Sequence, residues 1–214
     1  MKIGILGSGD VGLKLGDGFI SLGHSVKIGT RNTSKQSIID WIKKHGQKGS
    51  TGSFGDAASF GEVIVIATLW AGTLDAINLA NQKNFSNKVV IDVTNPLDFT
   101  KGMPPTLAVG QTNSAGEIIQ KLLPDAKVIK AFNTVGNPHF FRPNFPGGPP
   151  TMFICGNDSE AKKLVAGILT DFGWETQDTG GIEGSRLLES LAMLWITYYF
   201  KTNNGNHAFK LLRK

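Results

Sequence analysis

A glycine motif near the N-terminus restricts the fold more than any other feature of the sequence. Gly7–Gly12 reads G-S-G-D-V-G, between an apolar run at residues 2–6 and a segment with helical spacing at residues 10–22. In such a strand–turn–helix unit the first glycine permits a tight turn, the second lets backbone approach a pyrophosphate, and the third lets helix and strand pack closely. The helix N-terminus adds N–H donors and positive potential. A second apolar run at residues 25–29 completes the spacing of a dinucleotide-binding unit.

Alternating apolar runs and helical segments predict the rest of the fold. Strands are expected at residues 2–6, 25–29, 62–67, 88–93, 127–132, 151–155 and 174–178, and helices at 10–22, 34–44, 71–80, 159–172 and 185–201. Ser114 and Glu117 have the spacing of a capping box, which opens one more helix. Runs as apolar as residues 62–67 are typical of parallel strands buried on both faces. The pattern predicts an α/β, Rossmann-like doubly wound parallel sheet.

A proline-rich stretch suggests how the chain is divided. Residues 136–150 contain five of the nine prolines and are expected to form a long loop. We therefore expect a nucleotide-binding Rossmann domain at residues 1–150. Residues 151–214 are expected to form a small C-terminal α/β unit ending in an apolar helix, which can continue the same sheet.

Composition excludes several classes of protein. The 27 glycines among 214 residues exceed the usual share of about 7% but show no collagen period. The net charge of +5 comes without basic runs interleaved with aromatics, so no nucleic acid partner is expected. The lone Cys155 excludes an internal disulfide and reads as a buried small hydrophobe, and no metal-binding cluster is present. With no signal peptide and no apolar run of about 20 residues, we expect a cytoplasmic protein without membrane contact.

The segment after residues 25–29 indicates which dinucleotide binds. An NAD site commonly has an acidic residue there, which accepts from the ribose 2′-hydroxyl. No acidic residue occurs between Asp17 and Asp40, and the segment instead supplies hydroxyl, guanidinium, amide and ammonium groups. These donors suit a 2′-phosphate, with Arg31 as a fork donor and Lys35 as a point cation. The sequence therefore predicts NADP(H) rather than NAD(H).

Three further strand ends should line the same crevice, because carboxyl ends of parallel strands share one edge of a sheet. Asn95 and Asn133 are either amide contacts to a ligand or ordinary turn residues, and Trp70 is either a stacking wall or a packed aromatic. The expected cofactor-binding residues are Gly7, Ser8, Gly9, Asp10, Val11, Gly12, Thr30, Arg31, Asn32, Ser34, Lys35, Ala67, Thr68, Leu69, Trp70, Asn95, Pro96, Ala131 and Asn133.

No catalytic side chain is expected. The sequence lacks a Ser/His/Asp arrangement, an H-E-x-x-H motif and a convincing base in the crevice segments. Hydride transfer between two rings held at about 3–3.5 Å needs no protein acid or base at the carbon centre. Ketone or alcohol chemistry usually needs a proton donor, so a flavin-like ring is the better match for the partner.

Beyond these residues, the whole chain resembles a known family. The order GSGDVG, GTRNTSK, ATLW, TNPL, SAGEIIQKLLPDAKVIKAFNT, ICGND and DTGGIEGSRLLESL is similar to coenzyme F420-dependent NADP oxidoreductases. It also resembles the cytosolic oxidoreductase domain of the six-transmembrane metalloreductases. The resemblance implies NADP(H) at Gly7–Gly12, Thr30, Arg31 and Lys35, and hydride exchange with F420 or a flavin such as FMN or FAD. It also implies that dimers are common.

Two other functions remain open. A non-catalytic NADP(H)-binding redox sensor or partner-binding module would explain the glycine motif and Arg31 equally well. An imine or β-hydroxyacid reductase would need a long helical C-terminal domain, for which the residues after the loop are too few. The last helix, apolar nearly all round at residues 187–200, predicts a homodimer, with packing in the core as the alternative.

Overall fold

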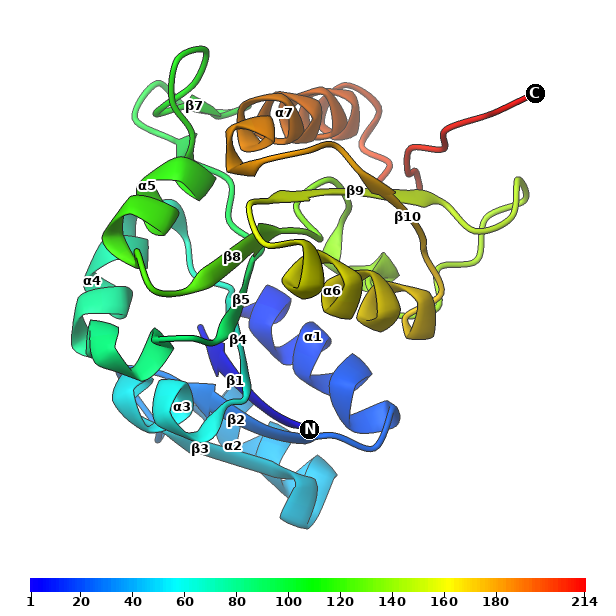
Figure 1. Ribbon diagram of the computed structural model, residues 1–214. Coiled ribbons are helices and arrows are strands. Elements are labelled where there is room, and N and C mark those ends of the chain that lie inside the picture. The colour runs from blue at the N-terminus through cyan, green and yellow to red at the C-terminus, as the bar shows by residue number, and fades with distance from the viewer.

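The computed structural model describes residues 1–214 and shows one eight-stranded sheet with helices on both faces (Figure 1). The strand order is β10-β9-β8-β5-β4-β1-β2-β3, so the expected doubly wound α/β fold is confirmed. The strands are β1 (Lys2–Leu6), β2 (Ser25–Gly29), β3 (Gly49–Gly52), β4 (Val63–Ile66), β5 (Val89–Asp92), β8 (Lys127–Lys130), β9 (Thr151–Gly156) and β10 (Glu175–Asp178). The helices are α1 (Asp10–Ser21), α2 (Gln36–His45), α3 (Phe54–Phe60), α4 (Thr73–Leu79), α5 (Ala115–Leu122), α6 (Ser159–Asp171) and α7 (Ser185–Thr202).

The sheet is parallel from β3 to β8, but β9 runs antiparallel to β8. Strand β10 is parallel to β9, with α6 as the crossover between them. The sheet is therefore mostly parallel, as the doubly wound fold predicts, and the pairing of β8 with β9 is its antiparallel step. The loop at residues 136–150 contains only a short 3₁₀ turn, Asn137–His139, and no crossover helix. Without such a helix the chain returns beside β8 in the opposite direction.

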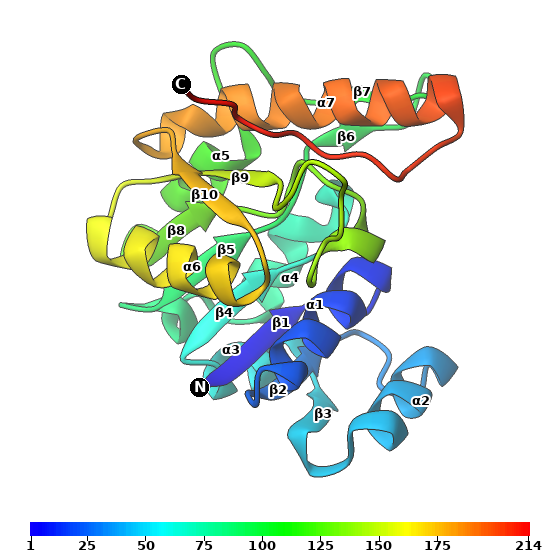
Figure 2. The ribbon, with the colours of Figure 1, turned by 90° about the vertical axis from the view of Figure 1, so that its right-hand side faces the viewer.

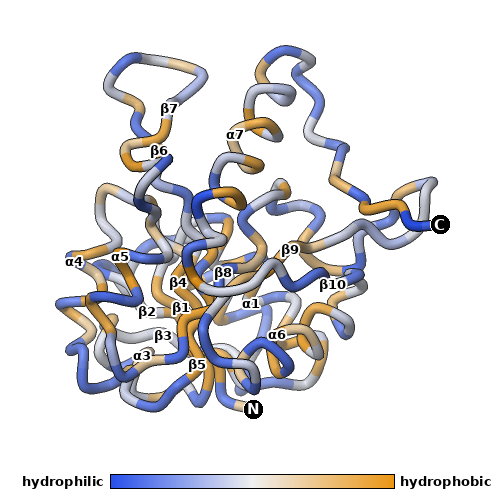
Figure 3. Tube along the Cα trace, turned by 45° about the horizontal axis from the view of Figure 1, so that its top comes forward, coloured by the Kyte–Doolittle hydropathy of each residue, from blue (hydrophilic) through white to orange (hydrophobic).

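Two apolar clusters fill the space on the two faces of the sheet, and the central strands run through the middle as the most apolar part of the chain (Figure 3). On one face α1 and α6 contribute side chains such as Phe19 and Val165. On the other face α3, α4 and α5 contribute Phe54, Ile77 and Ile119. Strands β1, β4 and β5 lie between these layers, which explains their nearly continuous apolar sequence.

Two glycines in α1 have a packing role that the sequence did not reveal. A Cβ at Gly16 would lie 2.8 Å from the Trp41 ring of α2, and one at Gly18 would lie 2.6 Å from the Phe172 ring. Both distances are too short for a side chain. The glycines lower helix propensity, but they let α1 approach its aromatic neighbours closely.

Three elements were missed by the sequence pattern. Strand β3 reads G-S-T-G and lies at the sheet edge, where no apolar alternation is needed. Helix α3 has only 7 residues and is opened by a complete capping box between Ser53 and Asp56. The hairpin of β6 (Leu97–Asp98) and β7 (Thr106–Leu107) is too short to give a period.

Residues 151–214 extend the main sheet. Strand β9 pairs with β8 through Ile129 opposite Gly156 and Lys130 opposite Cys155. After α7 the chain turns back along this helix (Figure 2), and the Phe209 carbonyl accepts from the Thr151 N–H at 2.9 Å. The division at residue 150 stays a prediction. None of the helices combines the length and apolar character that crossing a membrane requires.

Cys155 is fully buried in β9, as expected, and its Sγ lies 3.2 Å from Ser185 Oγ. Burial raises the pKa of this thiol from 9.0 to about 11, an effect that the Ser185 hydrogen bond partly offsets. Because the folded protein holds the proton more tightly, this contribution to stability is complete below 9.0 and is lost as pH rises through about 11. We expect a thiol reagent at about pH 8 to label Cys155 only as urea unfolds the protein. Labelling of the folded protein at the rate of a free thiol would contradict this prediction.

Candidate functional site

The predicted site segments meet at one edge of the sheet. The last residues of the strands lie in register, with Leu6 beside Gly29 and Ile66, Ile66 beside Asp92, and Asp92 beside Lys130. The segments that follow β1, β2, β4, β5 and β8 therefore leave the sheet together. Ligands of open α/β sheets bind at such an edge.

The three motif glycines have different surroundings. Gly7 has φ +127°, its N–H donates to the Gly29 carbonyl at 3.0 Å, and a Cβ there would lie 2.3 Å from the Ala67 oxygen. A Cβ at Gly12 would lie 2.1 Å from the Gly7 oxygen, so this position holds α1 against the turn. Gly9, the N-cap of α1, has no atom within 4 Å of its Cβ position. Backbone is thus open at the start of α1, where an anion would meet free N–H groups.

The segment after β2 is shaped by its own hydrogen bonds. The hydroxyls of Ser8 and Thr30 lie 2.9 Å apart, which joins this segment to the glycine motif. Thr30 Oγ1 accepts from the Asn32 N–H at 3.2 Å, and Asn32 Oδ1 accepts from the Ser34 N–H at 2.9 Å. Thr30 is buried, whereas Arg31, Asn32, Ser34 and Lys35 are exposed. Thr30 and Asn32 thus hold the shape of the turn.

The two cations of this turn have no acidic partner. Lys35 Nζ donates to the Ser8 carbonyl at 3.3 Å, which brings it beside the glycine motif. Neither Arg31 nor Lys35 belongs to any ion pair of the chain. Their charges are therefore available to an anionic group bound between them. Asp10 and Val11 lie in the first turn of α1.

The segment after β4 offers mainly backbone and one exposed side chain. Ala67 is buried, and the hydroxyls of Thr68 and Thr73 lie 2.9 Å apart, which fixes the turn into α4. Leu69 is 75% exposed, while Trp70 packs against the apolar cluster of α4 and α5. The packed-aromatic interpretation of Trp70 therefore has the better support.

The strand ends after β5 and β8 are tied to each other. Asn95 Nδ2 donates to the Asn133 carbonyl at 2.8 Å, and Asn133 Nδ2 donates to Asn95 Oδ1 at 3.0 Å and to the Leu188 carbonyl at 3.0 Å. Asn133 Oδ1 is buried and accepts no hydrogen bond. Ala131 and Pro96 are buried as well. These two asparagines thus form a reciprocal pair at the edge of the sheet.

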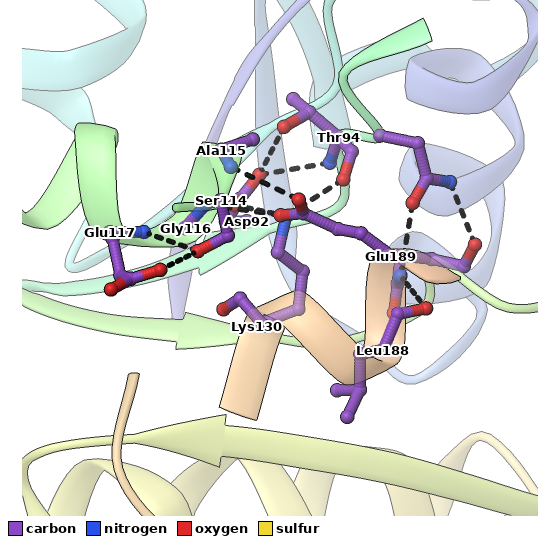
Figure 4. Close-up of polar contacts among 12 residues, drawn as sticks. Asp92, Thr94, Ser114, Ala115, Gly116, Glu117, Lys130, Leu188 and Glu189 are labelled. Atoms are coloured by element: carbon purple, nitrogen blue, oxygen red, sulfur yellow. Dashed lines mark hydrogen bonds and ion pairs between the residues drawn. The ribbon is translucent and has the colours of Figure 1, made fainter. Parts of the chain in front are cut away.

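A buried ionic cluster, which the sequence reading missed, lies at the ends of β5 and β8 that precede this pair (Figure 4). Lys130 Nζ lies 2.6 Å from Asp92 Oδ2 and 2.8 Å from Glu189 Oε1, and it donates to the Thr94 carbonyl at 2.8 Å. Lys130 and Asp92 are 0% exposed and Glu189 is 1% exposed. The signal was present, because Asp92 and Lys130 stand in otherwise apolar strands, where a charge needs a partner.

Electrostatics of the cluster favour the ionised lysine. Burial alone would lower the pKa of Lys130, but the carboxylates of Asp92 and Glu189 raise it on balance. Burial raises the pKa of Glu189, and Lys130 partly offsets this effect. Glu189 also accepts from the N–H groups of Ala115 and Gly116, each at 3.1 Å. The first turn of α5 therefore stabilises the Glu189 carboxylate.

The capping box expected at α5 is only half formed. Ser114 Oγ accepts from the Glu117 N–H at 3.1 Å, as expected. The Ser114 N–H, however, donates to Asn113 Oδ1 at 2.9 Å, and Glu117 pairs with Arg186 of α7. Glu117 Oε2 also accepts from Ser114 Oγ at 2.7 Å, so this carboxylate joins the N-cap of α5 to Arg186 of α7.

Known proteins of similar sequence carry names that fit this geometry. Residues 2–96 match the family model described as NADP oxidoreductase coenzyme F420-dependent. The F420-dependent NADP reductase of Methanocaldococcus jannaschii is 29% identical over 92% of this chain and 91% of its own length. Metalloreductase STEAP3 of Rattus norvegicus is 28% identical over 90% of this chain, which spans only 36% of that protein.

A solved structure that carries the same family name superposes on the whole chain. The crystal structure of a putative F420 dependent NADP-reductase from Arthrobacter sp. FB24 superposes with a TM-score of 0.95 over the whole of both chains, at 36% identity. An imine reductase of Streptomyces aurantiacus has a TM-score of 0.68 at 13% identity, and 65% of that chain is covered. This second likeness concerns the fold alone.

Proposed function

Because the chain belongs to the coenzyme F420-dependent NADP oxidoreductases, an oxidoreductase family, we propose that it transfers hydride between the nicotinamide of NADP(H) and the deazaflavin ring of F420. One observation carries the proposal: the open glycine turn at α1 stands beside a turn with two unpaired cations and no carboxylate. That combination suits a dinucleotide with an extra phosphate on its ribose.

In the proposed binding mode each part of NADP(H) lies at its own part of this edge. The pyrophosphate would lie at Gly7–Gly12, against the N–H groups that begin α1. Arg31, Ser34 and Lys35 would hold the 2′-phosphate, and Thr30 and Asn32 would keep their turn in shape. Since β2 lies on one side of β1, the nicotinamide half would extend to the other side, over the ends of β4, β5 and β8. There its surroundings would be formed by Ala67, Thr68, Leu69, Trp70, Asn95, Pro96, Ala131 and Asn133.

The contacts of Lys130 argue against a proton donor at this end of the crevice and so favour hydride exchange between two rings. The bound NADPH would supply the hydride, and the chain would bind it, orient it and keep water from its ring. Lys130 Nζ is fully buried, forms ion pairs with Asp92 and Glu189, and donates to the Thr94 carbonyl. Lys130 is thus not free to act as the proton donor that imine or carbonyl reduction would need.

Steady-state oxidation of NADPH with different acceptors tests the proposal. The parent protein is incubated with NADPH and either F420, FMN, FAD or no acceptor. We expect turnover with F420 and little with the flavins. Turnover with a flavin but not with F420 would identify the flavin, and not F420, as the acceptor. Tight binding of NADPH without turnover of any acceptor would favour the non-catalytic sensor.

We also propose a homodimer, formed through the outer side of α7. Leu187, Leu194 and Tyr198 are exposed at 72%, 59% and 50%, with the half-buried Leu191 between them. Their spacing repeats every three or four residues, so they form one apolar stripe along the helix. The opposite side, with Leu188 and Ala192, packs against the body of the protein.

Leu194→Glu should therefore yield a monomer. A charge in the middle of an apolar interface would have to be buried without a partner. Light scattering at micromolar concentration gives the mass. Leu212→Glu is the matched control, since Leu212 is exposed and its neighbours Leu211 and Arg213 bond to Thr151 of β9 and Gln177 of β10. A monomeric parent protein would overturn the proposed dimer.

A further inference from the structure

We propose that Lys130, together with Asp92 and Glu189, positions the nicotinamide half of the cofactor for hydride transfer, an inference that rests on the proposed function. Lys130 is a positioning residue here, because it would act through the two strand ends that it holds. Neither the glycine motif nor the turn with Arg31 takes part in this network.

The place of the cluster in the fold is the first argument. Asp92 and Lys130 are the last residues of β5 and β8 and lie directly opposite each other. The two segments that follow carry Asn95 and Asn133, which are paired side by side. Both segments lie on the side of the glycine motif away from Arg31, where the reactive end of the cofactor would be. The cluster is thus directly below the surroundings of the nicotinamide.

The contacts of the cluster fix the segment after β5 from two directions. Lys130 Nζ donates to the Thr94 carbonyl at 2.8 Å. Asp92 Oδ1 accepts from the Thr94 N–H at 2.9 Å and from Thr94 Oγ1 at 2.7 Å. Both backbone polar groups of Thr94 are thereby engaged, directly before Asn95. A shift of Lys130 or Asp92 would move Asn95.

Glu189 extends the same network to two helices. Its carboxylate accepts from the N-terminal N–H groups of α5 and pairs with Lys130. The carbonyl of the preceding residue, Leu188, accepts a hydrogen bond from Asn133 Nδ2. Helix α7 is therefore tied, at neighbouring residues, to Lys130 at the end of β8 and to Asn133 just after it (Figure 4). Loss of the Glu189 charge would loosen α5, α7 and Asn133 together.

Stability alone does not explain such a cluster. Removing three charges from water costs a large desolvation free energy, and apolar residues of similar volume often give an equal or more stable protein. What hydrogen-bonded charges supply is a single geometry, because each donor and acceptor has a fixed direction. A rigid geometry at the strand ends matters for hydride transfer, where a misplacement of about 1 Å can lower the rate about 100-fold.

Glu189→Gln is the main test, because glutamine keeps the shape of the side chain while it removes the charge. Its amide cannot offer two acceptor oxygens to Lys130 and to the N–H groups of α5 at once. We measure kcat and KM for NADPH with F420, the isotope effect with 4-deuterated NADPH, and the affinity for 2′,5′-ADP, which lacks the nicotinamide. Glu175→Gln is the control, since Glu175 pairs with Lys210 at the surface.

We expect Glu189→Gln to lower kcat about 10- to 100-fold. The isotope effect should rise as hydride transfer becomes the slow step, while affinity for 2′,5′-ADP stays within about twofold, since the 2′-phosphate contacts are remote. Asp92→Asn should change kcat and the isotope effect in the same direction. It serves as the test variant if Glu189→Gln does not fold. An unchanged kcat and isotope effect in the folded variant would overturn the inference. A loss of 2′,5′-ADP binding in parallel with kcat would do so too, since it indicates general damage.

Failure of the proposed function is recognised separately. If none of the ring acceptors supports oxidation of NADPH by the parent protein, the proposed function is contradicted. The positioning of the nicotinamide is not contradicted by that result. Binding alone then decides: NADPH should bind less tightly relative to 2′,5′-ADP in Glu189→Gln than in the parent. An equal ratio in both proteins would overturn the positioning role.

Discussion

Arg31→Ala is expected to weaken NADPH binding about 10- to 100-fold, because a charge-assisted hydrogen bond contributes about 1.5–3 kcal/mol. NADH binding should hardly change, since NADH has no 2′-phosphate for Arg31 to contact. Fluorescence titration of both nucleotides on parent and variant gives the four dissociation constants. The parent protein should prefer NADPH clearly, and the variant should lose most of this preference.

Two further variants identify the source of the effect. Lys35→Ala should also weaken NADPH binding, but less, because a lysine is a point charge without the fork of an arginine. Arg213→Ala is the control for removal of a positive charge, since Arg213 contacts Gln177 far from the glycine motif. Equal affinity of the parent for NADH and NADPH would contradict the assignment of the turn. An equal loss of both nucleotides in Arg31→Ala would contradict it as well.

Lys130→Met is expected to destabilise the fold by about 3–5 kcal/mol, which is a large part of the total stability of a typical domain. Methionine fills a similar volume, so the loss arises from the charges. Asp92 and Glu189 would remain buried and face each other without a cation. Urea unfolding followed by circular dichroism measures the change in the free energy of unfolding.

Lys127→Met is the matched control, because Lys127 begins the same strand and pairs with Asp158 at the surface, 3.3 Å away. Exposed ion pairs contribute only about 0–1 kcal/mol, so this variant should stay close to the parent. Combining Lys130→Met with Glu189→Gln should recover part of the lost stability, since one uncompensated carboxylate is removed. Equal stability of Lys130→Met and Lys127→Met would contradict the account of the cluster.

Local sequence patterns predicted the parts of the fold that short segments determine. Gly7–Gly12 and the adjacent apolar runs are sufficient to specify strand, turn and helix, so β1, α1 and β2 lie where expected. The apolar stretches at β4 and β5 were equally clear. Strand β3 was missed because an edge strand with the sequence G-S-T-G carries no apolar period. The direction of β9 depends on how a loop closes, which periodicity does not reveal.

The candidate site was predictable to a similar degree. The glycine motif and Arg31 belong to one continuous βαβ unit, so spacing alone brought them together. Asp92, Lys130 and Glu189 come from three distant parts of the chain, and only the folded sheet joins them. A charge inside an apolar strand was the available signal, although it could not name the partners. Asn95 and Asn133 were expected in the crevice, but their mutual pairing required the register of β5 and β8.

Transfer of deuterium from 4-deuterated NADPH to F420 tests the central claim most directly. The reduced F420 is isolated after turnover with the parent protein, and its mass is measured. Direct ring-to-ring transfer predicts reduced F420 that carries deuterium from the nicotinamide, and unlabelled NADPH in deuterated water should leave that ring carbon unlabelled. Tight NADPH binding with no deuterium delivered to F420 would contradict the account.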